Sequence, residues 1–410
     1  MSLTTHEDGN PRHEPLVTGA TTNQARYNEN ACAAGRPPSH LGPLCTTLPP
    51  MSHTDLSRRH FLGAATSLAG ASLAPVALAA DKKDDELESL IAKPPAGFSP
   101  MNAPGKIVKV EKGGGDFAAL MQPNLLWPKA DVAKAMLEKA LTAFTGTSSI
   151  AEALGKFVHK NDTVAIKVNG IAGQSGATMA VNFELILPVV EGLLKLGVPA
   201  DKIVVFEQFG SYLRGTRINV KGNKLPKGVK AEIHGNSLTK MKAIPVFEKV
   251  KTQYVRFFTE ATAVIDMTQI KDHSICGYTG CLKNISHGCI TNPQKHHAHK
   301  ASPQIAVLYK HPIVTSRVRL HITDGFKLIY DQGPLDKNPK RRIPHGAVYV
   351  STDPVAMDTI GWKIIDAARK DNGLKSLKAV NREPTYIAKA ADFGLGEHSE
   401  SKIKLKSYSI

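Results

Sequence analysis

From Lys106 onward the chain alternates short apolar runs with longer amphipathic stretches, and this alternation limits the folds that it can adopt. A short apolar run bounded by polar residues is typical of a buried strand, and apolar residues at every third or fourth position are typical of a helix that covers a sheet. Repeated alternation of the two favours an α/β fold. We therefore predict a largely parallel mixed sheet flanked by helices, in two structural halves with a pocket at their junction.

The predicted strands are the apolar runs Ile107–Val110, Thr163–Val168, Ile203–Phe206, Ala263–Asp266, Arg319–Thr323 and Ala347–Val350. The predicted helices are the stretches with apolar residues at helical spacing, Ala130–Leu141, Ser149–Phe157, Phe183–Leu196 and Ala356–Ala368. Polar residues follow several of the strands, at the edge where open α/β sheets place their ligands. The functional site is therefore expected among the residues that follow these strand ends.

The segment 51–79 has the features of an export signal. It contains a twin arginine, Arg58-Arg59, and then an Ala-rich apolar stretch that ends in Ala77-Leu78-Ala79, a small-x-small cleavage pattern. This combination is typical of a twin-arginine signal peptide. We expect the twin-arginine export machinery as a partner, a periplasmic or otherwise exported location, and no stable membrane span after cleavage; an uncleaved anchor is the alternative.

The segments on either side of this signal differ in composition. Residues 1–50 show no apolar period and precede Met51, the start that we expect, so we interpret them as an extension outside the native protein or as a disordered segment. Residues 80–105 are charged and then Pro-rich, as is typical of a linker. The α/β domain is expected to occupy residues 106–410.

The mature chain is strongly basic. Its net charge stays at the +16 of the full chain, because the segment before residue 80 holds equal numbers of arginines and acidic residues. Such an excess favours anionic partners, including a small anionic ligand. The charge is spread along the chain and few aromatic residues accompany it. Together with export, this argues against nucleic acid as a partner.

Residues 271–299 crowd together three cysteines and five histidines. Groups that bind metals or move protons cost free energy to bury, so their concentration predicts a functional site. Cys276, Cys281 and Cys289 carry donor atoms suited to a metal ion or an iron–sulfur cluster, with His287 or His297 among the histidines that complete the set. Their spacing matches no standard pattern, and a Cys276–Cys281 disulfide beside a free Cys289 is the alternative. The histidines from residue 296 to 299 are alternatively surface residues.

Several motifs, taken in order, resemble one family. They are Lys167-x-Asn169 before a Gly-rich loop that ends at Thr178, then Asp266, Lys271-x-His273, Thr279-Gly-x-x-Lys283-Asn284-x-x-x-Gly288, Asp324-Gly, Asp353-Pro354 and Asp358. This series is similar to the signature of the domain of unknown function 362 family. Its members include exported proteins and proteins fused to ferredoxin-type iron–sulfur modules, and this chain lacks the cysteine run of such a module. The resemblance implies a shared pocket and points loosely to redox or metal-linked work.

Lysines and amides at the edge of a parallel sheet can bind a carboxylate or phosphate and stabilise an oxyanion. We predict three catalytic residues, His273, Lys283 and Asn284. The predicted substrate-binding residues are Lys167, Asn169, Thr178, Lys271 and Thr279. Lys167 and Asn169 lie two apart on one strand and so share a side. We expect these two to line one cavity with the three catalytic residues.

The aspartates near the strand ends and the Gly-rich loop each have two interpretations. Asp266, Asp324, Asp353 and Asp358 follow or end predicted strands, where they can act as acids, bases or cation ligands. For Asp353, which precedes Pro354, a helix N-cap is favoured, and Asp358 faces either the pocket or water. The Gly-rich loop from Gly170 to Thr178 is either an anion cradle or an ordinary turn.

Three functions follow from these observations. Export and the density of cysteine and histidine favour a metal or iron–sulfur-linked redox protein that uses this pocket. An enzyme that performs acid/base chemistry on a small anionic substrate is the second. A cell-envelope ligand-binding protein, supported by charge alone, is the third.

Overall fold

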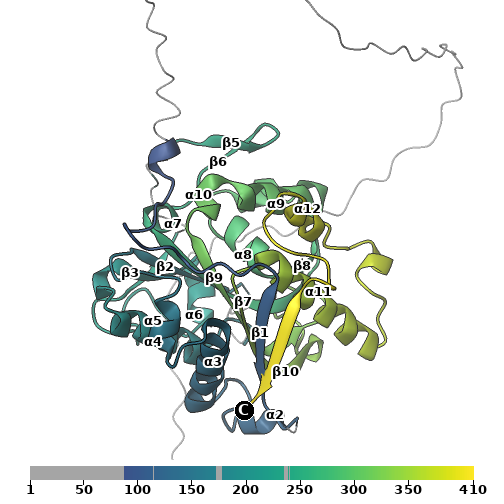
Figure 1. The fold of residues 1–410 in the computed structure, drawn as a ribbon. Helices are drawn as coiled ribbons and strands as arrows, with labels where there is room; N and C mark the ends of the chain where they lie inside the picture. The colour runs from purple at the N-terminus through teal and green to yellow at the C-terminus, as the bar shows by residue number, and fades with distance from the viewer. Residues whose placement is uncertain (1–86, 114, 172–177, 235–238, 240) are drawn as a thin grey trace, which may run out of the picture. The chain divides into compact units, whose positions relative to one another are not determined.

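The computed structural model of the protein describes residues 87–113, 115–171, 178–234, 239 and 241–410, and nine strands within these residues form one mixed sheet (Figure 1). The strand order is β11-β1-β10-β9-β7-β2-β3-β4, and β8 pairs with β7 alone. Residues 1–50, the expected signal peptide and most of the Gly-rich loop before Thr178 lie outside the described residues, so the predictions made for them stay predictions.

The strands of the sheet are β1 (Lys106–Glu111), β2 (Val164–Val168), β3 (Ile203–Glu207), β4 (Lys230–Ile233), β7 (Ala263–His273), β8 (Gly277–Thr279), β9 (Val318–Ile329), β10 (Arg342–Ser351) and β11 (Lys404–Ser409). The run β9-β7-β2-β3-β4 is parallel, and β10 is antiparallel to both of its neighbours. A separate hairpin joins β5 (Ile244–Phe247) to β6 (Val250–Thr252). The predicted fold class, a mostly parallel sheet flanked by helices, is confirmed; its division into two halves stays a prediction.

The helices are α2 (Phe117–Leu120), α3 (Ala130–Thr145), α4 (Ile150–Leu154), α5 (Phe183–Leu196), α6 (Gly210–Gly215), α7 (Arg256–Glu260), α8 (Cys281–Ser286), α9 (Ser302–Lys310), α10 (Pro312–Thr315), α11 (Pro354–Asp371) and α12 (Tyr386–Asp392). Within the part of the chain that the structure describes, none of these helices is long and apolar enough to cross a membrane.

Two apolar cores lie on opposite faces of the sheet, because successive side chains of a strand point to opposite sides. In β2, Val164 and Ile166 belong to the first core, and Ala165 between them belongs to the second. Helices α3, α4 and α5 supply the first core, and α8, α9, α11 and α12 supply the second. Figure 1 shows α3, α4 and α5 grouped together, well apart from α9, α11 and α12. Because Lys167 has the parity of Ala165, it faces the second layer, which contains α8.

The sequence predicted the central elements better than the outer ones. Helix α5 has the predicted bounds, and the six predicted strands are all present. Strands β7 and β9 are longer than predicted, since each continues through polar residues that are buried by the layer above. Asp266 and Asp324 therefore lie within strands, and their predicted position at strand ends is wrong. The unpredicted strand β11 is an exposed edge strand with the mixed sequence KLKSYS, which carries little apolar signal.

Candidate functional site

Three neighbouring parallel strands place a row of titratable side chains across the sheet. Lys167 on β2 is in register with Asp266 on β7, and Asp266 is in register with His321 on β9. Each of the three residues is at most 1 % exposed. Because buried charges cost free energy unless they are paired and hydrogen-bonded, the side chains that lie over this row determine its chemistry. Two of them, Cys281 and Asn284, come from α8.

Helix α8 is fixed over the row by Asp358 of α11. The Asp358 carboxylate accepts hydrogen bonds from the backbone N–H groups of Cys281 (2.6 Å) and Leu282 (3.1 Å), which begin the helix. A carboxylate at this position satisfies donors that have no partner within the helix. Burial raises the pKa of Asp358 to about 8. Asp358 therefore faces neither the pocket nor water, so both predicted orientations are wrong. Asp353, by contrast, is the N-cap of α11, as predicted.

Asn284, one turn after Cys281, links the row to the neighbouring strands. Its amide nitrogen donates to Asp266 (2.7 Å), and its amide oxygen accepts from Lys167 (3.2 Å) and Asn169 (3.3 Å). Lys167 also forms an ion pair with Glu207 at the end of β3 (3.0 Å). The charge of Lys167 is therefore balanced by Glu207, and Asn284 connects it to Asp266.

A cavity of about 160 Å³ opens beside this network, at the ends of β2, β3 and β7. Polar side chains line much of it, namely Lys167, Asn169, Glu207, Gln208, Tyr212, His273, Thr279, Lys283, Asn284, His287, Gln294 and His297. The structure thus brings together in one cavity the five residues expected there from the sequence, together with Thr279. This confirms their common location, and their catalytic and binding roles stay predictions.

Lys283 lies buried in the wall of this cavity and faces a histidine instead of a carboxylate. Its Nζ is 3.4 Å from Nε2 of His297, and no carboxylate of the described residues lies within 4.0 Å of it. Nδ1 of His297 lies 2.9 Å from the carbonyl oxygen of Pro293, so Nδ1 carries the proton and Nε2 is the acceptor. Lys283 therefore donates to the lone pair of His297.

The two other histidines of the cavity have different hydrogen bonds. Nδ1 of His273 accepts the backbone N–H groups of Ile275 (3.1 Å) and Cys276 (3.4 Å), which leaves the proton on Nε2. Both ring nitrogens of His287 are engaged, with the hydroxyl of Ser286 (3.1 Å) and the carbonyl of His296 (3.0 Å). His273 thus offers a donor, and His287 is held in place by its neighbours.

Burial keeps the imidazoles of the cavity neutral. It lowers the pKa of His297 to about 4, and the positive charge of Lys283 lowers it further. The same two causes, in the same order, hold the pKa values of His273 and His287 well below the usual range. Burial also lowers the pKa of Lys283. The imidazoles beside Lys283 are therefore neutral, and no carboxylate of the described residues balances the charge of this lysine. This part of the cavity lacks negative charge.

The family model of a domain of unknown function (DUF362) matches residues 164–363 of the chain. Residues 164–363 are a DUF362 domain. The resemblance seen in the sequence motifs is therefore confirmed, and no curated protein matches the chain. Strands β1 and β11 lie outside the matched range, so the sheet extends beyond the DUF362 domain on both sides in sequence.

Two predicted substrate-binding residues of the DUF362 domain do not line the cavity. Lys271 is fully buried behind Asn169 and donates to its side-chain oxygen at 2.6 Å. Thr178 accepts hydrogen bonds from Lys327 (3.0 Å) and Arg342 instead. Lys271 therefore positions Asn169, and Thr178 belongs to a separate basic cluster. Neither residue lines the cavity, and their role in substrate binding stays a prediction.

The predicted metal ligands of the DUF362 domain do not converge. Cys276, Cys281 and Cys289 are free and buried, so the alternative disulfide is wrong as well. The thiol of Cys276 donates to the carbonyl of Tyr278 (3.2 Å), and burial raises the pKa values of Cys276 and Cys289. His287 and His297 line the cavity, and none of the three cysteines does. The proposed centre of three cysteines and a histidine is therefore absent among the described residues.

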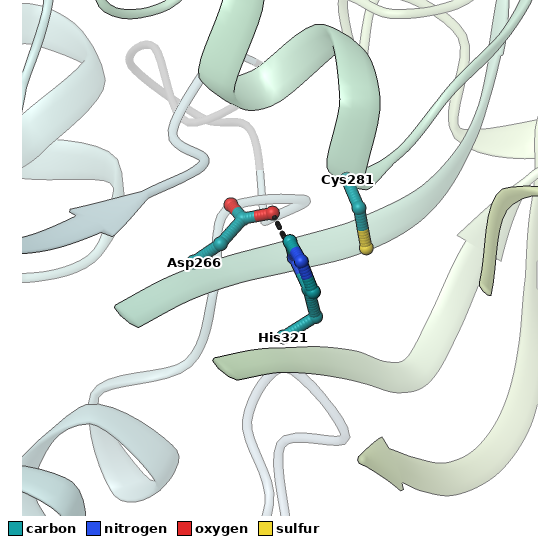
Figure 2. A group of neighbouring side chains, drawn as sticks. All are labelled: Asp266, Cys281 and His321. Atoms are coloured by element: carbon teal, nitrogen blue, oxygen red, sulfur yellow. Dashed lines mark hydrogen bonds and ion pairs between the residues drawn. The ribbon is translucent and has the colours of Figure 1, made fainter. Parts of the chain in front are cut away.

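One cysteine does join a group of metal-binding character. Among the described residues, Asp266, Cys281 and His321 form a set whose ligand atoms all lie within 4.8 Å of one another. Figure 2 shows the three side chains pointing toward one another from β7, α8 and β9. The Asp266 carboxylate lies 2.8 Å from Nδ1 of His321. The DUF362 domain thus contains an Asp/Cys/His group next to the cavity.

Sequence reasoning missed Glu207, His321 and Tyr309. Glu207 ends β3, the parallel neighbour of β2, so its position at a strand end was a usable signal. His321 interrupts an apolar strand, and a buried histidine in such a run marks a polar network. Tyr309, whose hydroxyl lies 3.3 Å from Nε2 of His321, is on α9 and gave no such signal.

Proposed function

We propose that the DUF362 domain binds a small anionic molecule, of the carboxylate or phosphate class, in the cavity beside α8 and transfers a proton to or from it. The observation that carries this proposal is the buried Lys283, whose ammonium has a histidine neighbour and no carboxylate partner among the described residues. An anionic ligand would supply the missing charge, and charge-assisted hydrogen bonds to lysine are strong in a buried site.

His297 and His273 have different roles in the proposed proton transfer. His297 presents an unprotonated Nε2 that faces Lys283, and the carbonyl of Pro293 fixes its ring. This is the arrangement of a general base with an orienting group. His273 presents a protonated Nε2 and can donate to an oxygen of the ligand. Proton transfer in this site therefore uses His297 with Lys283, while His273 acts as a donor.

Asn284 and Lys167 hold the position of the ligand indirectly. Every strong hydrogen-bonding group of Asn284 is engaged, with Asp266, Lys167 and Asn169. Such a fully bonded network is rigid, and a rigid polar wall stabilises developing charge without reorganisation. We assign Asn284 a positioning role, in place of the catalytic role expected from the sequence.

Small-anion binding tests the proposal. Phosphate, pyruvate, malonate and citrate are titrated calorimetrically into the full chain, into Lys283→Met and into Lys295→Met. We expect at least one anion to bind the wild type, and Lys283→Met to weaken its binding about tenfold or more, the loss of one charge-assisted hydrogen bond. Lys295→Met removes the same charge from an exposed residue nearby and should bind like the wild type. Equal weakening in both variants would mean that only net charge matters and would contradict the proposal.

A metal-linked role is supported by a different set of residues from the set predicted from the sequence. Among the described residues, the five predicted ligands do not form one centre; they are Cys276, Cys281, Cys289, His287 and His297. The Asp266, Cys281 and His321 group is what supports a metal ion here. We therefore propose no iron–sulfur chemistry for the cavity.

Export through the twin-arginine pathway remains our proposal for the location of the protein. It is supported by Arg58-Arg59, the apolar stretch that follows and the cleavage pattern at Ala77-Leu78-Ala79. In the periplasm, a basic protein that binds small anions would meet metabolites and cell-envelope fragments.

A further inference from the structure

We infer that Asp266, Cys281 and His321 form a binding site for one divalent transition-metal ion, of which zinc is the best fit. The site lies beneath the cavity of the proposed function and goes beyond that function, because the metal would not contact the anion. Two observations carry the inference: the donor set and the second layer of hydrogen bonds around it.

The donor set suits a borderline metal ion. One carboxylate oxygen, one thiolate and one imidazole nitrogen are the ligand types that zinc binds, and hard cations such as magnesium avoid sulfur. The candidate ligand atoms already lie within 4.8 Å of one another, in a row of residues in register across β7 and β9 with α8 above it (Figure 2). Ligands of a tetrahedral zinc ion are about 3.3–3.6 Å apart. The distance of 2.8 Å between the Asp266 carboxylate and Nδ1 of His321 therefore has to increase slightly when the ion binds.

Each of the three ligands has an outer hydrogen-bonding partner that leaves its metal-facing atom available. Asn284 donates to Oδ1 of Asp266 (2.7 Å), the oxygen that does not face His321. The hydroxyl of Tyr309 lies 3.3 Å from Nε2 of His321, and that of Thr268 lies 3.8 Å from the sulfur of Cys281. Metal sites in proteins use such partners to orient their ligands. An ion pair between Asp266 and His321 alone would require neither the Cys281 thiol nor the Tyr309 hydroxyl.

The charges balance when the ion is bound. The cation carries two positive charges, and the Asp266 carboxylate and the Cys281 thiolate carry one negative charge each. His321 is neutral. Binding would release the thiol proton and leave the imidazole proton on Nε2, from which the N–H group donates a hydrogen bond to the hydroxyl oxygen of Tyr309. A neutral group of this kind is favourable in a location where the ligand residues are at most 1 % exposed.

The bound ion would also fix the position of residues that line the cavity. Asp266 is one hydrogen bond from Asn284, and Asn284 is one hydrogen bond from Lys167. A metal that fixes Asp266 therefore fixes the amide that orients Lys167. Cys281 and Asn284 lie one helical turn apart on α8, so the same helix delivers a metal ligand and the cavity wall.

A cobalt titration tests this inference. The full chain is treated with a chelator, and Co²⁺ is added. We expect about one equivalent to bind, with thiolate-to-cobalt charge-transfer absorption, and an excess of Zn²⁺ to remove that absorption. Cys281→Ser and His321→Gln should lose it. Cys276→Ser and Cys289→Ser, which remove the other buried thiols, should keep it.

The test is decisive even if the ligand variants fail to fold. X-ray absorption of the wild type with Co²⁺ should show one sulfur neighbour and the rest nitrogen or oxygen. A folded wild type without a sulfur neighbour, or with two or more, would overturn the inference, as would charge-transfer absorption that persists in Cys281→Ser. Because the readout is the metal, its result is independent of the anion titration that tests the proposed function.

Discussion

The ammonium group of Lys283 lies 3.4 Å from Nε2 of His297, a residue fourteen positions later in the chain. The carbonyl of Pro293 holds the other ring nitrogen of His297 at 2.9 Å, so this lysine meets a neutral base instead of an acid. Neither residue makes a conventional ion pair among the described residues. The first prediction concerns this pair.

We expect His297 to be neutral, with its proton on Nδ1, throughout the physiological pH range. Burial and the nearby Lys283 lower its pKa to about 4. The nitrogen shifts of isotopically labelled histidine, followed by NMR from pH 8 to pH 4, measure both the tautomer and the pKa. Lys283→Met should raise the pKa of His297, because the second of these causes is removed. A His297 signal that titrates near 6.5 in the wild type would show that the pair is not formed.

The second prediction concerns the pH dependence of stability at Lys271. Burial lowers the pKa of this fully buried amine from 10.5 to about 7. Between these two values the unfolded state binds a proton that the folded state does not, so Lys271 makes stability rise with pH from about 7 to 10.5, by at most about 1.4 kcal/mol per pH unit. Chemical denaturation at pH 7 and pH 9 should show a smaller rise for Lys271→Met than for the wild type.

The control for this measurement is Lys134→Met, which removes an exposed lysine of α3. Its stability should change between pH 7 and pH 9 as that of the wild type does. If Lys271→Met and the wild type gain the same stability over this interval, the amine is charged in the folded protein and the prediction is wrong.

The third prediction concerns Gly288. A Cβ at this position would lie 2.7 Å from Cε of Lys167 and would press against the carbonyl oxygen of Asn284. Gly288→Ala should therefore displace Lys167 and lower stability by roughly 1–3 kcal/mol, the usual range for overpacking. Gly113→Ala, where the nearest atom is 3.6 Å away, should change stability little. Thermal unfolding of the two variants compares them, and equal melting temperatures would contradict the close packing of Gly288 on Asn284 and Lys167.

The fourth prediction concerns export. Replacement of Arg58 and Arg59 by lysine should retain the protein in the cytoplasm, since the twin-arginine pathway requires the arginine pair. Cell fractionation of a bacterium with an intact pathway measures the location, and a variant with Lys82 and Lys83 replaced by arginine is the charge-matched control. Translation from Met51 should suffice for full export. Unchanged export of the double-lysine variant would exclude this pathway.

The sequence alone determined the α/β class, the central strands and the segment that carries the cavity. These follow from local patterns: apolar runs in β2, β3, β7, β9 and β10, helical spacing in α5 and polar residues after strands. The common location of Lys167, Asn169, His273, Lys283 and Asn284 was also predictable, because parallel strands end at one edge of a sheet.

Only the tertiary structure decided which of these residues meet. Asp266 and His321 are 55 residues apart in sequence and become neighbours through the register of β7 and β9. Cys281 joins them because Asp358, from a third element, fixes the start of α8. The sequence spacing of Cys276, Cys281 and Cys289 could not show that strand β8 and helix α8 direct the thiols to different neighbours. Register and helix placement are long-range properties, and local sequence patterns do not contain them.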